Sequence, residues 1–308
     1  MEHYIRKLIH NLQNKDYGTV NLILDGGAFS GSYILGSLYY IRELEKNNRI
    51  SVNRLSGCSI GSILCIMYVL DDLDYISDMY ETVRESFKEK GNLFIIRSCI
   101  EELQSRLPEN FFEKCNEKIY LSYYDIDNYC HIVKSQYESN DDLMETLLKS
   151  SYIPYVCGDT KLYKNRFLDG LKPHLFDSGK TLFVNLCMNY KCISGMLHIK
   201  NEVNNMERIL NGMLDVHTFF LQEAPTTMCY YIDEMNMYQT CMYRLRLLIT
   251  ECAVFIIYIT HFGGRHIYSK LCSYPGLQEY MKYCLNRWRP MYTWIQSSLY
   301  IFMQYTMV

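Results

Sequence analysis

Within its first 70 residues the chain twice follows a β-prone run with a turn of small residues and then a helix. The first strand is expected at Thr19–Leu24 and its helix at residues 32–46, where apolar positions recur near helical spacing. The second strand is expected at residues 50–56 and its almost wholly apolar helix at residues 60–70. Two such units favour an α/β fold with a largely parallel central sheet.

The rest of the chain shows fewer strand signals. Residues 72–149 are expected to be mainly helical, with an interruption near Pro108, and strand signals return at residues 166–168 and 181–187. Beyond about residue 194 the pattern is helical or irregular, and no repeat or linker marks a boundary. The expected organisation has three parts: an N-terminal lead at residues 1–18, an α/β domain at 19–190, and a mostly helical region at 191–308.

Composition excludes several classes of function. The 308 residues carry 31 Lys+Arg against 34 Asp+Glu, and a net charge of −3 gives no electrostatic footprint for nucleic acid. The 13 cysteines are odd in number and never spaced Cys-x-x-Cys, so neither a disulfide framework nor a zinc site is expected. No secretory signal precedes the first strand, and we expect a reducing, cytosol-facing location.

A Gly-x-Ser-x-Gly sequence occupies the turn between the second strand and its helix. Gly57 and Gly61 allow a sharp bend that holds the hydroxyl of Ser59 at the helix N-terminus. There the helix dipole and the Ile60 amide are placed to stabilise negative charge on an attacked carbonyl oxygen. The competing interpretation is a tight turn that merely begins a helix.

The turn after the first strand is also rich in small residues. Gly26, Gly27 and Ala28 would expose successive amides at a helix N-terminus, which suits an anion or an oxyanion. A dinucleotide fingerprint is not met cleanly because Ala28 stands where a glycine is required, and the Gly-Lys-Ser/Thr of a P-loop is absent. An oxyanion-binding loop therefore remains.

A nucleophilic serine needs a proton acceptor, and the eight histidines offer no distinctive context. Asp169 does, because it ends a predicted strand and precedes Gly170, where a carboxylate could face the serine directly. The alternative for this pair is an ordinary Asp-Gly turn.

Taken together, these loops resemble the patatin-like phospholipases, and most closely their adipose triglyceride lipase branch. Residues 25–36 (DGGAFSGSYILG) are similar to the glycine-rich stretch of that branch, and residues 150–158 (SSYIPYVCG) to the segment that precedes its catalytic aspartate. The Gly-x-Ser-x-Gly turn and Asp169-Gly170 supply the other two signatures. The resemblance covers roughly residues 19–190.

The resemblance implies a three-layer α/β/α fold that hydrolyses fatty acyl esters of glycerolipids, phospholipid or triacylglycerol, at a membrane or lipid-droplet surface. It assigns Ser59 as nucleophile, Asp169 as general base, and the amides of Gly26, Gly27 and Ala28 as the oxyanion hole. The reaction would proceed through an acyl-Ser59 intermediate without metal or organic cofactor.

Three positions depart from the family pattern: Ala28 replaces the third loop glycine, Ser30 replaces a basic residue of plant and bacterial relatives, and Leu171 follows Asp169-Gly170 where Gly or Ala is usual. Two alternatives therefore stay open. One is a degenerate relative that binds lipid surfaces without turnover. The other is a Ser-His-Asp hydrolase that would use a later histidine, such as His198, His217 or His261.

Two apolar segments lie near the C-terminus. Residues 291–308 contain no charged side chain, and their length is at the lower edge of what spans a bilayer. Their Thr, Ser and Gln content favours a packed or interfacial helix, with peripheral attachment as the membrane hypothesis. Residues 247–260 carry Glu251 and are expected to form a core helix or strand.

Overall fold

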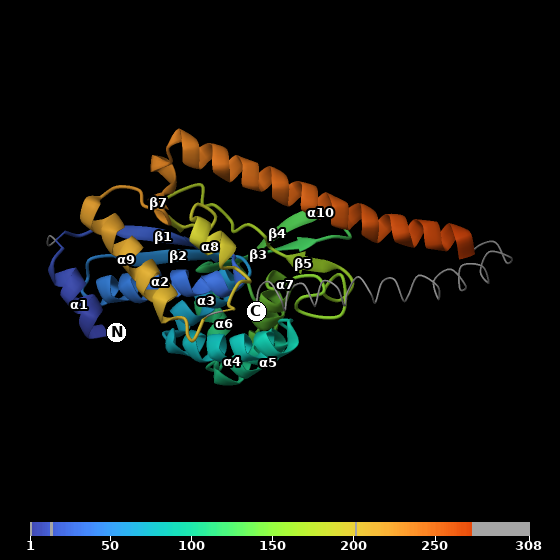
Figure 1. Cartoon of the computed structure of the whole chain (residues 1–308), viewed down its shortest axis with the longest axis horizontal. Coiled ribbons are helices and arrows are strands. Elements are labelled where there is room, and N and C mark those ends of the chain that lie inside the picture. The colour runs from blue at the N-terminus through green and yellow to red at the C-terminus, as the bar shows by residue number, and fades with distance from the viewer. Residues whose placement is uncertain (1, 13–14, 201, 273–308) are drawn as a thin grey trace.

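The computed structural model describes residues 2–12, 15–200 and 202–272. The segment 291–308, expected to be a packed or interfacial helix, lies outside the described residues. Within the described part the chain forms one seven-stranded sheet with helices packed against it (Figure 1).

The middle of the sheet is parallel and its margins are antiparallel. The order is β4-β3-β2-β1-β6-β7, with β5 paired to β3. The parallel strands are β1 (Thr19–Leu24), β2 (Ser51–Gly57), β3 (Ile119–Asp125) and β6 (Thr181–Val184). The antiparallel strands are β4 (Cys130–Lys134), β5 (Phe167–Asp169) and β7 (Cys229–Tyr231). The predicted α/β class with a largely parallel sheet is confirmed.

Side chains alternate between two cores across the sheet, as the pleat requires. Leu22 and Leu24 face the large core that contains α2 (Gly31–Lys46), α3 (Ile60–Leu70) and α9 (Met206–Gln222). Ile23, between them, faces a smaller core on the other side with Phe176, Phe183 and Tyr230. Because β1 is covered on both faces, it is almost wholly apolar.

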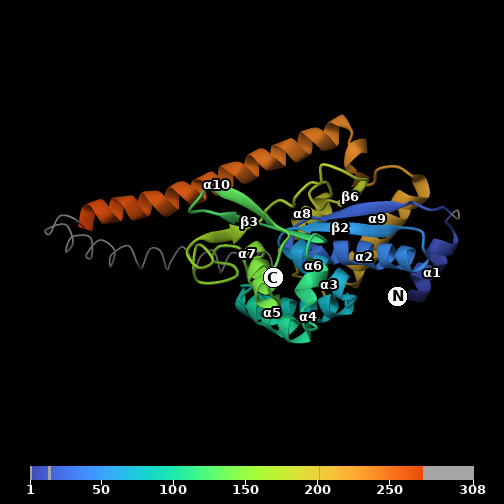
Figure 2. The same ribbon diagram turned by 180° about the vertical axis from the view of Figure 1, so that it is seen from behind.

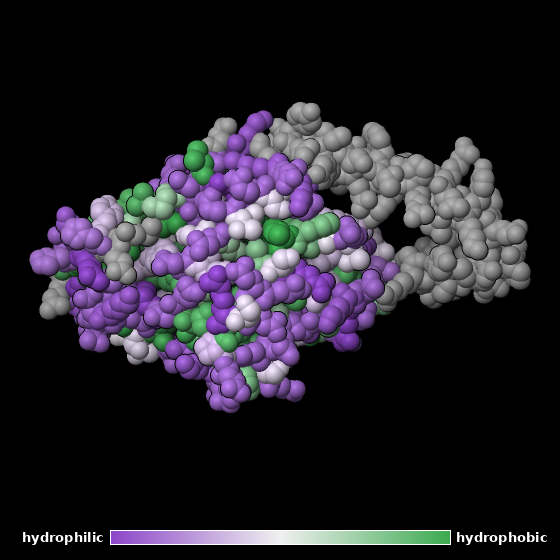
Figure 3. Space-filling view, turned by 90° about the horizontal axis from the view of Figure 1, so that it is seen from below, coloured by the Kyte–Doolittle hydropathy of each residue, from purple (hydrophilic) through white to green (hydrophobic). Residues whose placement is uncertain are grey.

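The remaining helices surround this centre. Among them, α7 (Asn140–Ser150) begins where the Ser139 hydroxyl accepts a hydrogen bond from the Asp142 amide at 3.1 Å, a standard N-cap. The others are α1 (Glu2–His10), α4 (Asp74–Lys90), α5 (Ile95–Arg106), α6 (Phe111–Cys115) and α8 (Tyr190–Ser194), with 3₁₀ turns at Ala28–Ser30 and Ile232–Glu234. The surface on the side of α4 and α5 is mainly hydrophilic (Figure 3).

Three strands were absent from the sequence-based prediction. Residues 72–149 are mainly helical, as expected, but the prediction missed β3 and β4, whose Tyr, Ile and Val residues pair as an antiparallel hairpin. The expectation of no strand beyond residue 194 is wrong for β7, which pairs with β6. The boundary expected at residue 190 therefore runs between two paired strands.

The C-terminal part of the described chain is one long helix, α10 (Met237–Cys272), which crosses the molecule and projects beyond the sheet (Figures 1 and 2). The mostly helical C-terminal region is thus confirmed. By length and composition its portion Met237–Gly263 is apolar enough to cross a membrane, yet only 6% of the most apolar window is buried in the protein. The expectation of a core element at residues 247–260 is therefore wrong: the segment is helical, but one of its faces is exposed.

That exposed face is a continuous apolar stripe. Residues three, four and seven apart share one face of a helix, and the six members form two groups with these spacings, 245–249 and 255–259, that lie two turns apart. Leu248 and Ile256 are each 62% exposed. The α10 stripe consists of Leu245, Leu248, Ile249, Phe255, Ile256 and Ile259.

Candidate active site

Ser59 occupies a strained turn between β2 and α3. Its φ of 54° and ψ of −129° lie outside the regions that L-residues normally adopt. Such a conformation costs about 1–3 kcal/mol and persists only where the surroundings enforce it. It holds the serine at the N-terminus of α3, as expected for a nucleophile elbow.

The two elbow glycines are required by close backbone packing. A Cβ on Gly57 would lie 2.5 Å from the carbonyl oxygen of Gly61. A Cβ on Gly61 would lie 2.5 Å from the carbonyl oxygen of Leu24 at the end of β1. Because any side chain would force these segments apart, the glycines allow the elbow to sit directly against the first strand.

Strand register brings Asp169 to the elbow. On β3, Leu121 pairs with Gly57 at the end of β2, and Tyr123, two residues further, pairs with Asp169 at the end of β5. Since β4 occupies the other edge of this part of β3, β5 continues along the edge that β2 has left. The ends of β2 and β5 therefore face each other, although 110 positions separate Ser59 from Asp169 in the sequence.

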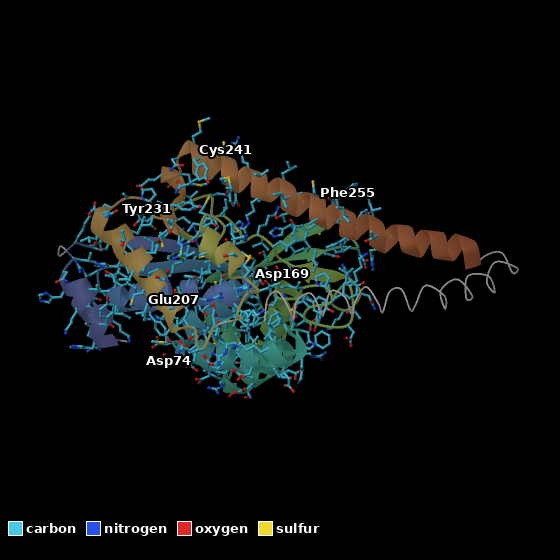
Figure 4. All side chains as sticks on the ribbon, in the orientation of Figure 1. Asp74, Asp169, Glu207, Tyr231, Cys241 and Phe255 are labelled. Atoms are coloured by element: carbon cyan, nitrogen blue, oxygen red, sulfur yellow. The ribbon has the colours of Figure 1, made fainter. Side chains whose placement is uncertain are left out.

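Asp169 is buried, and burial is the main reason that its pKa is raised from 3.8 to about 6. The amide of Leu171 donates to Oδ1 at 2.8 Å, and the Ser59 hydroxyl and Arg246 also favour the ionised form. Oδ2 has no hydrogen bond of normal geometry, so the contact with Ser59 is not a well-formed bond. Figure 4 shows Asp169 inside the molecule, below the ribbon of α10 in that view.

The end of α7 and the residues just after it hold the backbone of both Ser59 and Asp169. The carbonyl of Ser150 accepts the Ser59 amide at 3.0 Å, and the carbonyl of Tyr152 accepts the Asp169 amide at 3.0 Å. The hydroxyl of Ser150 also bonds Ser62 on α3 at 2.7 Å. Sequence reasoning singled out residues 150–158 only by resemblance, and their positioning role follows from these bonds.

The loop before α2 supplies free amides beside the serine. A Cβ on Gly26 would lie 3.1 Å from the Ser59 Cβ, so this loop packs directly on the elbow. The Gly26 amide itself donates to Asp25 at 2.9 Å and is therefore engaged. Within the described part of the chain, the amides of Gly27, Ala28 and Ile60 donate to no recorded acceptor.

An apolar pocket opens beside Ser59. Its wall includes Ala28 and Ile60, so two of the free amides belong to residues that border the same space as the serine. The remaining wall is formed almost entirely by apolar side chains of α3, α4 and nearby segments, including Ile63, Ile76, Met79, Tyr80, Val83, Leu93, Ile96 and Ile153. This apolar lining suits a hydrocarbon chain.

Two of the three histidines proposed for a triad, His217 and His261, have side-chain partners away from Ser59. His217 lies 2.8 Å from the Tyr40 hydroxyl, and His261 lies 3.7 Å from Asp127. No histidine is among the groups that shift the pKa of Asp169. In the described ranges, no three His, Cys, Asp or Glu side chains gather as metal ligands.

The departures from the family pattern have local explanations. Ser30 is buried away from the pocket, where its hydroxyl donates to the Cys192 carbonyl at 2.6 Å and accepts from Arg208. Leu171 has a φ of 55°, a conformation that glycine adopts without cost. Its side chain packs against the small buried apolar cluster that includes Val254 of α10. Gly170 passes so close to Ser122 that a Cβ would lie 2.2 Å from its carbonyl oxygen.

The fold and the site define an α/β protein built around a Gly-x-Ser-x-Gly elbow that faces a buried aspartate on a neighbouring strand. Residues 22–171 match the family model of the patatin-like phospholipases. This part of the chain is a patatin-like phospholipase domain, and the resemblance noted in the sequence is confirmed at the level of the family.

Two curated relatives are similar over part of their length. The chain is 24% identical over 161 residues to the mouse 1-acylglycerol-3-phosphate O-acyltransferase Pnpla3, covering 49% of this chain and 38% of that protein. It is 27% identical over 198 residues to the probable lipid hydrolase 463L of Invertebrate iridescent virus 6, covering 55% of this chain and 65% of that protein. The chain thus spans less than two thirds of each relative.

Proposed function

We propose that this protein is a serine acyl hydrolase that cleaves fatty acyl esters of glycerolipids, with Ser59 as nucleophile and Asp169 as general base. The observation that carries the proposal is the facing pair itself: a serine held in a strained elbow beside an apolar pocket, and a buried carboxylate with a raised pKa on the neighbouring strand. The patatin-like domain and the names of its relatives support the same class of reaction.

In the proposed first step, the Ser59 oxygen attacks the ester carbonyl carbon while its proton passes to the Asp169 carboxylate. A base with a pKa of about 6 is largely ionised at neutral pH and still accepts a proton readily. The amides of Gly27 and Ala28, with Ile60 at the helix N-terminus, are the proposed donors to the oxyanion. Gly26 is left out of this set because its amide is engaged by Asp25.

Collapse of the tetrahedral intermediate breaks the ester C–O bond, and the departing alkoxide takes the proton from Asp169. The glycerol-containing alcohol leaves and the acyl group remains on Ser59. Asp169 then removes a proton from water, the hydroxide attacks the acyl carbonyl, and the proton returns to Ser59 as the fatty acid departs. The acyl chain would lie in the apolar pocket throughout both steps.

The substrate surface is the second part of the proposal. Six apolar side chains of the α10 stripe face solvent, whereas the opposite face of the same helix is tied to the domain by Arg246 and Glu251. Such a helix suits attachment in the plane of a lipid surface better than a crossing of it. We propose that the protein meets its glycerolipid substrate at a membrane or lipid-droplet surface through this stripe, on the cytosolic side.

The test is labelling by a fluorophosphonate probe together with release of fatty acid from mixed glycerolipid vesicles. Wild type is expected to label and to release fatty acid, Ser59→Ala to do neither, and Asp169→Asn to lose both by at least about 10²-fold, as expected for loss of a general base. Ser194→Ala, an exposed serine, serves as the control. Full activity in either site variant would refute the proposed pair.

The same assay separates two other functions. Binding to vesicles without labelling would indicate a patatin-like protein that has lost turnover. One relative is named as an acyltransferase of 1-acylglycerol-3-phosphate. Addition of that acceptor shows whether the acyl group passes to water or to another lipid, because only transfer produces a new diacylated product.

A further inference from the structure

The buried ion pair between Asp25 and Arg246 joins two segments that the catalytic proposal needs. Arg246 lies on α10, 221 positions from Asp25, and its Nη1 and Nη2 donate to Oδ2 and Oδ1 at 2.8 and 2.5 Å. Asp25 is fully buried, at 0% exposure. This bidentate geometry is the strongest that an arginine makes with a carboxylate, and it fixes the orientation of both groups.

Asp25 in turn organises the loop that carries the free amides. Its Oδ1 accepts the Gly26 amide at 2.9 Å, and its Oδ2 accepts the Leu186 amide, after β6, at 3.0 Å. Four donors therefore converge on one carboxylate. The orientation of this carboxylate sets the direction in which the chain leaves β1 toward Gly27 and Ala28.

Arg246 also reaches the loop of the proposed base. Its Nη2 donates to the Leu171 carbonyl at 2.9 Å. The backbone amide of Leu171 donates in turn to Asp169 Oδ1 at 2.8 Å. One guanidinium thus contacts the oxyanion-side loop and the base-side loop at once. A second bond holds the same segment to α10, because Lys172 Nζ lies 2.5 Å from Glu251.

We propose that Arg246 is a positioning residue for ester hydrolysis, which fixes the Gly26–Ala28 loop and the Asp169 loop at the separation that the reaction requires. The inference rests on the proposed function of Ser59 and Asp169. Arg246 borders neither Ser59 nor the apolar pocket, so it acts through Asp25 and Leu171. Misplacing catalytic groups by about 1 Å costs roughly 10²-fold in rate.

The arginine has an electrostatic effect as well. Its positive charge favours the ionised form of Asp169, so its removal is expected to raise the pKa of that carboxyl further. His131, which bonds the Lys172 carbonyl at 3.3 Å, has its pKa lowered to about 4, mainly by burial, and is neutral across the range of the test. The other titratable or charged groups that surround this site are Asp25, Cys58, Cys157, Lys172, Cys187, Tyr230, Tyr243 and Glu251.

The experiment compares Arg246→Met, Arg246→Lys and the control Arg244→Met, an exposed arginine two positions away on the same helix. Each full-length variant is assayed for the rate of fluorophosphonate labelling. Its kcat and KM are measured on a soluble short-chain ester between pH 5 and 9, about two pH units on either side of neutrality. Circular dichroism and thermal unfolding report folding.

Arg246→Met is expected to lower kcat by about 10- to 100-fold with little change in KM, and to move the acidic limb of kcat/KM to higher pH. Arg246→Lys keeps the positive charge but cannot make the bidentate hydrogen bonds of a guanidinium. It is therefore expected to keep the acidic limb of kcat/KM at the wild-type pH and to retain only part of the wild-type kcat. Arg244→Met is expected to match wild type. If Arg246→Met fails to fold, Arg246→Lys decides the question through its reduced kcat.

Wild-type kcat and an unshifted pH limb in a folded Arg246 variant would overturn the positioning role. A loss of activity that follows only the unfolded fraction would also overturn it, because a purely structural arginine produces that result. Wild-type protein that does not label at Ser59 would instead overturn the proposed function, and the inference with it. The two failures are therefore distinguishable.

Discussion

Replacing Asp169 with asparagine is expected to stabilise the protein at neutral pH while it removes the proposed base. Burial raises the pKa of this carboxyl from 3.8 to about 6. Since each pKa unit corresponds to about 1.4 kcal/mol, ionisation of Asp169 costs the folded state about 3 kcal/mol relative to the unfolded chain. Asparagine cannot ionise, and its side-chain oxygen can still accept the Leu171 amide.

The sign of the pH dependence follows from proton binding. Between about pH 4 and pH 6 the folded protein holds the Asp169 proton more tightly than the unfolded chain does. This group therefore lowers the wild-type free energy of unfolding by about 3 kcal/mol as pH rises through that interval. The Asp169→Asn variant lacks the effect, so its stability relative to wild type is expected to grow by the same amount.

The measurement is urea unfolding of the full chain, followed by circular dichroism at several pH values from 4 to 8, about two units on either side of the pKa of Asp169. The matched control is Asp159→Asn, because Asp159 is an exposed aspartate in a loop. This variant is expected to leave the pH dependence of the free energy of unfolding unchanged. Parallel wild-type and Asp169→Asn curves over this range would refute the reasoning, because they would mean that burial does not perturb the carboxyl.

Three further predictions concern packing, selectivity and attachment. Gly212→Ala is expected to destabilise the folded protein by about 1–3 kcal/mol, because the new Cβ would lie 1.8 Å from the Tyr33 carbonyl oxygen. Gly263→Ala has open space around its Cβ and is expected to be neutral or stabilising, and thermal unfolding compares the two variants. Val83→Phe narrows the pocket and is expected to lower long-chain ester hydrolysis about tenfold relative to butyrate ester; an unchanged chain-length profile would remove the acyl assignment. Leu248→Asp on the α10 stripe is expected to weaken binding to lipid vesicles about tenfold, measured by co-sedimentation, while activity on a soluble ester persists. Binding equal to that of wild type would argue against the stripe as the lipid-contacting surface.

Local patterns predicted the centre of the fold because each depends on a few consecutive residues. The elbow around Ser59 requires glycines at fixed spacing between a strand and a helix, and both neighbouring elements carry clear apolar periodicity. Strand β3 escaped prediction because its polar and aromatic residues, such as Ser122 and Tyr123, lack simple alternation. Its pairing with β4 supplies the stability that local propensity does not.

Features that depend on distant parts of the chain were not predictable. The pairing of Asp25 with Arg246 joins charges 221 positions apart, and no local pattern marks either member. The apolar content of α10 is visible in the sequence, but hydropathy cannot tell a buried helix from an exposed one. The engagement of Gly26 by Asp25 is likewise a tertiary contact, and it changes which amides are available.

The entry of β7 and α10 into the body of the molecule has a practical consequence for anyone who trims this chain. A fragment that stops at residue 190 would strip the outer strand from β6 and leave the carboxylate of Asp25 without its counter-ion. An isolated charge in such a dry environment is costly, so the glycine-rich turn would rearrange to reach water. Inactivity of a shortened version would therefore report damage at this junction and say nothing about the chemistry of Ser59.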